Sequence, residues 1–428
     1  SIHIFDTYMI HPILKKKIEI RLGQKVLNRG DCELLSNLIL ETIDIEISYN
    51  TIRRLFGLAG NVKANKKTLN TLAKFVGYRN YIHFMQTHLE EETQNLSILI
   101  FRVVYQADKA KVIKLVQNTK RSSENFLNFV ILLSRELLYN KHYDLLNQVF
   151  ELDELAYDNF SYSEVLFIGN AIGLVLRKQQ IKNNVFLDNT NFLRCVYLTF
   201  VDYSNINGYY ADWTTAINKN KKTKELEVFT KAILEFREFL NKRTVKDSFK
   251  KLAFNTTLHP ILCSRLLSVK IMANKYDNLE PILDEYYQIH SKHKSKILEY
   301  SFELFITAIT TKNMVLMRYI INLIDLDKNQ HLFFLKDRLN LFYLMAMFYY
   351  KLTKNNAKKN KYLTLFGLDN IRYSYEDYIK LLYDVFLYSE ARTEPLKKSI
   401  KNDYIQLNKK LKYPYFSEAY LINYFIDK

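Results

Sequence analysis

The side chains best suited to chemistry lie close together, in the stretch YNTIRR at residues 49–54. Asparagine can form two hydrogen bonds with adenine, and arginine can form two with guanine. A threonine near a helix N-terminus can help to hold a phosphate. This stretch therefore predicts contact with a nucleic acid through Tyr49, Asn50, Thr51, Arg53 and Arg54.

The chain around this stretch is free of negative charge. From Ile47 to Leu89 there is no Asp or Glu, whereas seven residues are basic: Arg53, Arg54, Lys63, Lys66, Lys67, Lys74 and Arg79. The whole chain has a formal net charge of +17, which favours contact with a polyanion or an acidic surface. Lys63, Lys66 and Lys67 are expected to contact phosphates. The alternative is a structural bundle whose basic face meets only solvent.

A short helix is expected to position the YNTIRR side chains. Ser48 is suited to cap its N-terminus, and Ile52, Leu55 and Phe56 recur at the three- and four-residue spacing of one helical face. If this face points into a core, the polar and basic side chains are left outside.

Four more short helices complete the predicted N-terminal bundle. Asp31 precedes the second helix as a candidate cap, while Gly57 and Gly77 follow helix ends. The predicted ranges are Pro12–Leu22, Asp31–Thr42, Ser48–Phe56, Lys67–Val76 and Asn80–His88.

The succession DCELLSNLILET, ISYNTIRRLFG and NKKTLNTLAKFVGYRNYIHF resembles Cro/repressor-type helix-turn-helix domains. The resemblance covers under a fifth of the chain. It implies that one helix supports a short recognition helix, with a later helix (Thr68–Ala73) closing the core. The connection Ile43–Ile47 is longer than the tight turn usual for the family.

The scarcity of Gly and Pro predicts an all-α fold. Only 9 Gly and 5 Pro occur among 428 residues, whereas α/β and all-β folds need glycine at many turns. The acidic, polar stretch Glu90–Asn95 is the predicted hinge. It separates a helix-turn-helix domain at residues 1–92 from a helical domain at residues 96–428.

Three segments of the second domain are similar to one another: Leu137–Leu152, Ile271–Tyr286 and Ala308–Leu323. Each places a lysine and a polar or aromatic turn ahead of another apolar helix. The second and third begin 37 residues apart, which suits a helical-hairpin repeat. The pattern resembles tetratricopeptide-like (TPR-like) repeats and predicts a curved array of hairpins. An irregular helical bundle is the alternative.

The sequence predicts no catalytic residue, no metal site and no cofactor. His290 and His293 lie three residues apart, but no third ligand is near them. The three cysteines are far apart, and the start of the chain lacks an apolar signal peptide, so a cytoplasmic protein is expected. The longest apolar runs are too short to span a membrane.

These patterns favour a DNA-binding transcription regulator. Its helical domain is expected to bind a peptide or protein, or to form a homodimer. Peptide-responsive regulators that couple these two modules have a similar arrangement. The competing hypotheses are a non-enzymatic helical adaptor in a larger assembly and an RNA- or ribosome-binding protein.

Overall fold

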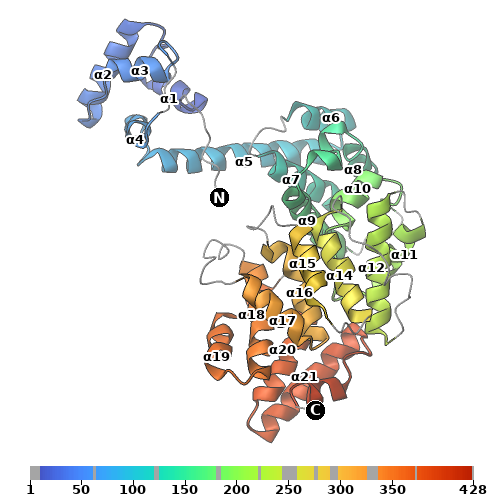
Figure 1. Ribbon diagram of the computed structural model, residues 1–428. Helices are drawn as coiled ribbons and strands as arrows, with labels where there is room; N and C mark the ends of the chain where they lie inside the picture. The colour runs from blue at the N-terminus through green and yellow to red at the C-terminus, as the bar shows by residue number, and fades with distance from the viewer. Residues whose placement is uncertain are drawn as a thin grey trace. The chain divides into compact units, whose positions relative to one another are not determined.

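The computed structural model describes residues 10–60, 64–119, 125–179, 185–219, 223–242, 258–273, 278–289, 297–324, 336–371 and 374–426. Across these ranges every regular element is a helix, and no strand occurs (Figure 1). The all-α prediction is confirmed. The chain divides into two compact units, Ser1–Arg102 (unit 1) and Val103–Lys428 (unit 2).

Unit 1 begins with four short helices at the predicted places: α1 (Pro12–Leu22), α2 (Arg29–Ile43), α3 (Tyr49–Leu55) and α4 (Lys66–Phe75). Helices α1 and α3 pack against α4 and α2 respectively, and α4 also contacts α2. One apolar cluster joins them, with Leu14, Leu35, Ile52 and Leu72 fully buried. Ile52 belongs to the apolar stripe that the sequence predicted, whereas that pattern did not assign Leu14 to a core.

The cap of α2 differs from the prediction. Asn28 is the N-cap, and its side chain accepts a hydrogen bond from the backbone N–H of Asp31 at 3.1 Å. Asp31 lies in the first turn and accepts the Asn28 backbone N–H at 3.0 Å in return. This capping box satisfies two backbone donors, so the helix starts earlier than the sequence suggested.

The fifth helix extends well beyond its predicted end. Helix α5 covers Tyr81–Tyr105 and includes the polar stretch that predicted a hinge, Glu90–Asn95. The two units divide after Arg102 rather than between residues 92 and 96. Polar side chains alone do not end a helix, and this stretch contains neither Gly nor Pro.

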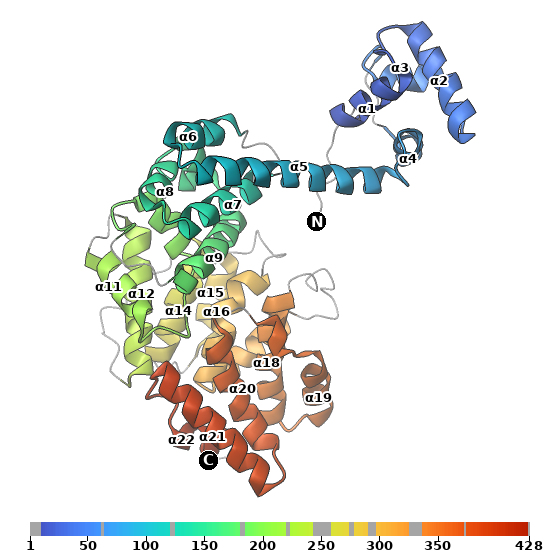
Figure 2. The same cartoon turned by 180° about the vertical axis from the view of Figure 1, so that it is seen from behind.

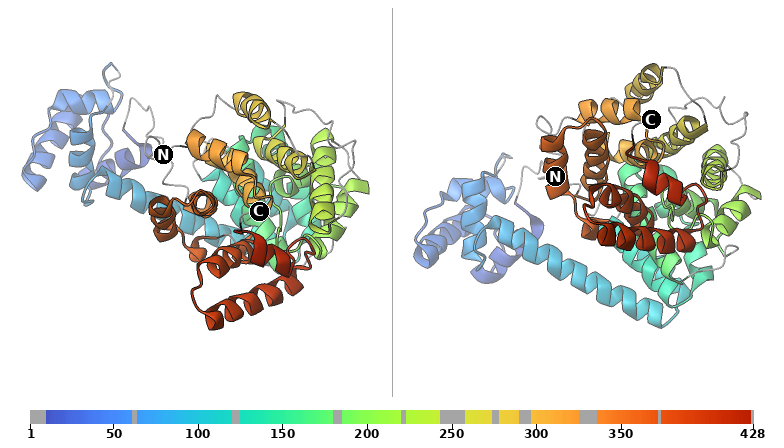
Figure 3. Two further views of the ribbon diagram at one scale, coloured as in Figure 1. Left: turned by 60° about the horizontal axis from the view of Figure 1, so that its bottom comes forward. Right: turned by 90° about the horizontal axis from the view of Figure 1, so that it is seen from below.

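Unit 2 consists of helices that pack largely in chain order. Helix α7 packs on α9, and α12, α14, α16 and α18 each pack against the next (Figures 1 and 3). Helices α20, α21 and α22 lie together at the C-terminal end (Figure 2). The bounds are α6 Lys109–Asn118, α7 Phe126–Tyr139, α8 Tyr143–Val149, α9 Tyr162–Gln179, α10 Thr190–Phe192, α11 Tyr209–Lys219, α12 Lys224–Leu240, α14 Pro260–Ala273, α15 Glu280–Ile289, α16 Ile297–Thr310, α17 Met314–Ile324, α18 Lys336–Leu352, α19 Asn356–Leu365, α20 Glu376–Glu390, α21 Glu394–Leu411 and α22 Glu418–Asn423.

Three hairpins of unit 2 share one turn. Lys141, Lys312 and Lys354 each follow a helix by two residues and adopt a left-handed backbone with φ of 60°, 52° and 58°. After each lysine, the next residue's N–H bonds a carbonyl five residues earlier, as in a Schellman motif. In two of the similar segments, the lysine (Lys141 or Lys312) therefore occupies the left-handed position after a helix end, where glycine is the usual residue. The corresponding Lys275 of the third segment lies outside the described residues.

A non-helical segment, residues 198–208, is mostly buried inside unit 2. It lies against α9 at two glycines: a methyl group on Gly173 would come within 2.1 Å of the Phe200 ring. The Ser204 backbone N–H donates to the Ser374 carbonyl at 3.1 Å, and the Tyr413 hydroxyl donates to the Tyr203 carbonyl. This segment joins helices that are far apart in the sequence.

Tyrosines provide much of the contact between helices in unit 2, as their amphipathic character predicts. The hydroxyls of Tyr415, Tyr420 and Tyr424 donate to the carbonyls of Thr310 or Ile309 at 3.0, 3.0 and 2.6 Å. Those carbonyls end α16 and have no partner within that helix. The C-terminal tyrosines thus cap the end of a distant helix.

Candidate nucleic-acid interface

Helix α3 presents the YNTIRR side chains, and its N-terminus is built as predicted. The Ser48 hydroxyl accepts the backbone N–H of Asn50 at 3.2 Å. The inward stripe is confirmed: Ile52, Leu55 and Phe56 are all buried in the core of unit 1. Gly57 follows with a φ of 76°, which ends the helix.

The outward side chains of α3 differ in their exposure. Asn50 and Arg54 are exposed, whereas Tyr49, Thr51 and Arg53 are half-buried. The Tyr49 ring packs against the core, and the Arg29 guanidinium lies 4.9 Å from its centre. Tyr49 is therefore less available to a ligand than the sequence suggested, because its ring fills space between α2 and α3.

Arg53 lies where α3 meets α2. Its Nη1 donates to Oδ1 of Asn50 at 3.5 Å, so the two candidate base-reading side chains are neighbours. Burial raises the pKa of the Cys32 thiol on α2, and the nearby positive charge of Arg53 opposes this rise. The thiol stays protonated, and the guanidinium has no carboxylate partner within unit 1 as described.

Two more candidate cations lie at the start of α4. The Asn65 side chain caps this helix by accepting the backbone N–H of Thr68 at 2.8 Å. Lys66 and Lys67 are exposed in its first turn, where the helix also presents unpaired N–H groups. Lys63, the third predicted phosphate contact, lies outside the described residues.

The cations at the outer surface of α3 and at the start of α4 have no carboxylate partner in the described part of unit 1. Among the described residues, no carboxylate lies within 4.0 Å of Arg53, Arg54, Lys66 or Lys67. By contrast, Arg29 on α2 pairs with Glu33 at 2.7 Å. The α3/α4 face, defined by Asn50, Arg53, Arg54, Lys66 and Lys67, is therefore a positive surface without carboxylate partners, although Lys16 on α1 and Lys74 on α4 are also exposed without one.

The cations of α1 support the fold of the same unit, a role that their sequence pattern did not reveal. Lys15 donates to the Phe56 carbonyl at 3.3 Å and lies over the Phe56 ring. Lys17 donates to the Tyr78 hydroxyl at 2.7 Å, and Arg21 lies over the Phe75 ring. A run of lysines in a sequence does not distinguish such packing from an exposed binding face.

Metal-ligating clusters and membrane spans do not occur in the described part of the chain. Within those ranges, no group of three or more His, Cys, Asp or Glu side chains could hold a metal ion. His290 and His293 lie outside those ranges. None of the helices that the structure describes has both the length and the hydropathy of a membrane span.

The α3/α4 face is therefore described from this protein only, because comparisons of the chain with known proteins found no match. No protein-family model, no curated protein and no solved structure matches it.

Proposed function

We propose that the protein is a DNA-binding transcription regulator. Unit 1 would contact DNA through the α3/α4 face, with α3 entering the major groove and the lysines of α4 reaching phosphates. Unit 2 would bind a peptide or protein, or form a homodimer, on a TPR-like array of hairpins. The cytoplasm is the compartment proposed, since all three cysteines are buried, free thiols.

The unpaired positive charge of the α3/α4 face carries this proposal. A cation paired within its own chain has little to gain from a phosphate, whereas an exposed unpaired one can release condensed counterions from DNA. Asn50 and Arg53 add the two side-chain types that read adenine and guanine. Three buried side chains, Ile52, Leu55 and Phe56, hold the helix in its own domain and leave those groups outside.

The decisive measurement is binding of labelled duplex DNA of random sequence across a salt series, from about 50 to about 200 mM. We expect affinity to fall steeply with salt. Replacing Arg53 and Arg54 by Ala should weaken binding by about 1–3 kcal/mol for each base that an arginine reads. The salt slope should become shallower by about one for each phosphate that an arginine neutralises.

A matched control removes two positive charges from unit 2 instead of from the α3/α4 face. Lys109 and Lys114 are exposed on α6 in unit 2, and replacing both by Ala lowers the net charge equally. If the two double variants bind DNA alike, the α3/α4 face is not the reader. If the intact chain binds no DNA at low salt, the adaptor hypothesis replaces this one. Stronger binding to RNA of the same length would favour the RNA hypothesis.

A further inference from the structure

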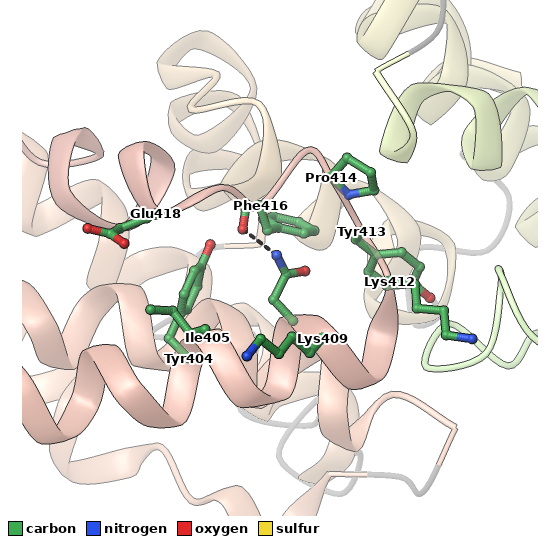
Figure 4. A pocket seen from close by; sticks show the side chains of 9 residues that line it. Tyr404, Ile405, Lys409, Lys412, Tyr413, Pro414, Phe416 and Glu418 are labelled. Atoms are coloured by element: carbon green, nitrogen blue, oxygen red, sulfur yellow. Dashed lines mark hydrogen bonds between the residues drawn. The ribbon is translucent and has the colours of Figure 1, made fainter.

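The C-terminal end of unit 2 contains a groove that the DNA-binding proposal does not use. It lies between the last turns of α21 and the loop that leads to α22, with a volume of about 410 Å³ (Figure 4). The Tyr404 side chain rises from α21 toward this loop (Figure 4). Pockets of roughly 300–1,000 Å³ are the size that holds small ligands.

The lining of the groove includes three aromatic residues, Tyr404, Tyr413 and Phe416, and is held in place by packing and a hydrogen bond. Phe416 is buried, and its ring meets those of Tyr378 and Tyr420 with centres 5.6 and 5.1 Å away. The Asn408 Nδ2 donates to the Phe416 carbonyl at 2.7 Å, which fastens the loop to α21.

Two polar atoms of this lining lack a hydrogen-bond partner in the structure: the Tyr404 hydroxyl and Asn408 Oδ1. Tyr404 is only 1% exposed. The neighbouring tyrosine hydroxyls behave differently, since those of Tyr413 and Tyr415 donate to backbone carbonyls. A buried hydroxyl without a partner is unfavourable, so a ligand that supplies one gains affinity.

The charges around the groove point to an anionic ligand. Lys409, Lys412 and Glu418 line it. The two lysines are exposed and have no carboxylate partner among the described residues, whereas the Glu418 carboxylate is paired with Lys401. On the same helix, Lys401 pairs with Glu418 at 2.5 Å and Lys410 pairs with Asp377 at 2.6 Å. Nearby carboxylates therefore pair with Lys401 and Lys410 but leave Lys409 and Lys412 unpaired beside the groove.

We infer that this groove binds the C-terminal end of a short peptide whose last side chain is apolar. The peptide carboxylate meets Lys409 and Lys412, and its last side chain packs on the accessible apolar lining residues Ile405 and Pro414. A backbone N–H donates to Asn408 Oδ1, and a backbone carbonyl accepts from the Tyr404 hydroxyl.

A peptide unit offers both the donor and the acceptor that the groove lacks, whereas a fatty acid offers no N–H. The inference rests on the ligand-binding role proposed for unit 2.

The test uses the full chain without DNA, so that its outcome is separate from that of the DNA experiment. The probe is a pool of N-acetylated tripeptides ending in Leu, Ile, Phe or Tyr, with a free carboxylate. The reference is the same pool with C-terminal amides. Ligand-observed NMR and titration should show the amides binding at least about tenfold more weakly, because they cannot form charge-assisted hydrogen bonds.

Variants separate recognition from folding. Tyr404→Phe should weaken binding by about two- to tenfold and leave the melting temperature unchanged or higher, because the hydroxyl it removes has no partner. Lys409→Gln with Lys412→Gln should weaken binding by more than about tenfold. Lys398→Gln, an exposed and unpaired lysine nearer the start of α21, serves as the control and should bind like wild type.

Several results would overturn the inference. These are no binding of the carboxylate pool, equal binding of the amide pool, wild-type affinity in the lysine double variant, or equal binding of dodecanoate.

Discussion

The two units differ in whether their charged side chains are exposed or buried. In the described part of unit 1, no Asp, Glu, Lys or Arg is buried, and the α3/α4 face carries its cations on the outside. Unit 2 buries several charged residues, among them Asp202, Arg265, Glu303 and Asp384. An exposed charge costs folding little and stays available to a ligand, whereas a buried one must be compensated within the chain.

In unit 2, the buried charge of Glu303 is compensated by an ion pair and two tyrosine hydrogen bonds. Arg265 Nε donates to its carboxylate at 3.1 Å, and the hydroxyls of Tyr203 and Tyr375 donate to it as well. Burial has the largest single influence and would lower the pKa of Arg265, but the Glu303 carboxylate and the neighbouring tyrosines together outweigh it and raise that pKa. Each of the other two guanidinium nitrogens donates one hydrogen bond, to the carbonyls of Leu198 and Thr199 respectively. Arg265 thereby ties α14 to α16 and to the buried segment.

Replacing one partner of the Arg265–Glu303 pair should cause the largest loss of stability among the substitutions considered. We expect Arg265→Met to reduce the free energy of unfolding by about 3–5 kcal/mol, because Glu303 is left buried without a counter-charge. Urea denaturation followed by Trp213 fluorescence measures this in unit 2, since the only tryptophan is buried there. The double variant with Glu303→Met should recover much of the stability. A decrease below about 1 kcal/mol in the single variant would contradict the account.

Packing against the buried segment gives the next largest expected effect. Gly173→Ala should destabilise unit 2 by about 2 kcal/mol, because the new methyl overlaps the Phe200 ring, which is itself buried. Trp213 fluorescence during urea unfolding reports the change. Gly208→Ala is the control in the same unit, where the nearest atom lies 3.4 Å from the added methyl. Equal stability of the two variants would show that the segment can move aside.

Asp384 should make the stability of unit 2 depend on pH. Burial raises the pKa of this carboxyl to about 7, although the charge of Lys380 opposes the rise and that of Asp403 adds to it. The folded state then holds a proton that the unfolded chain releases near its ordinary pKa. Stability is therefore highest in acid and declines as pH rises from about 4 to about 7.

Asp384→Asn should remove that decline. We expect it to raise the free energy of unfolding by about 2 kcal/mol at about pH 8 and to change little near pH 4. Trp213-detected urea curves at both pH values provide the measurement. A variant that keeps the wild-type pH dependence would show that Asp384 does not cause it.

The smallest effect is expected on the α3/α4 face. Replacing Arg53 and Arg54 by Ala should change the stability of unit 1 by within about 0.5 kcal/mol, as is usual for surface substitutions. Hydrogen exchange of the α2 and α4 amides, read by mass spectrometry, measures this without a tryptophan in unit 1. A marked decrease in protection would mean that these arginines support the fold, and the contrast between the units would fail.

The sequence by itself determined the helices and the inward face of α3. Ile52, Leu55 and Phe56 could be assigned to a core because side chains at three- and four-residue spacing lie on one side of a helix. Ser48 and Gly57 set the ends of that helix through local hydrogen bonds and backbone conformation. Such features depend only on neighbours in the chain, so a local pattern reveals them.

Only the tertiary structure decided which charged and polar groups are engaged. Arg265 and Glu303 are 38 residues apart, and no spacing rule connects them. Lys15 packs over Phe56, while Lys409 lies unpaired beside a groove. Lysines look alike in a sequence because the fate of each charge depends on the dielectric and the partners that distant segments bring to it. The candidate surfaces of this protein are therefore defined by the cations that its own fold leaves without partners.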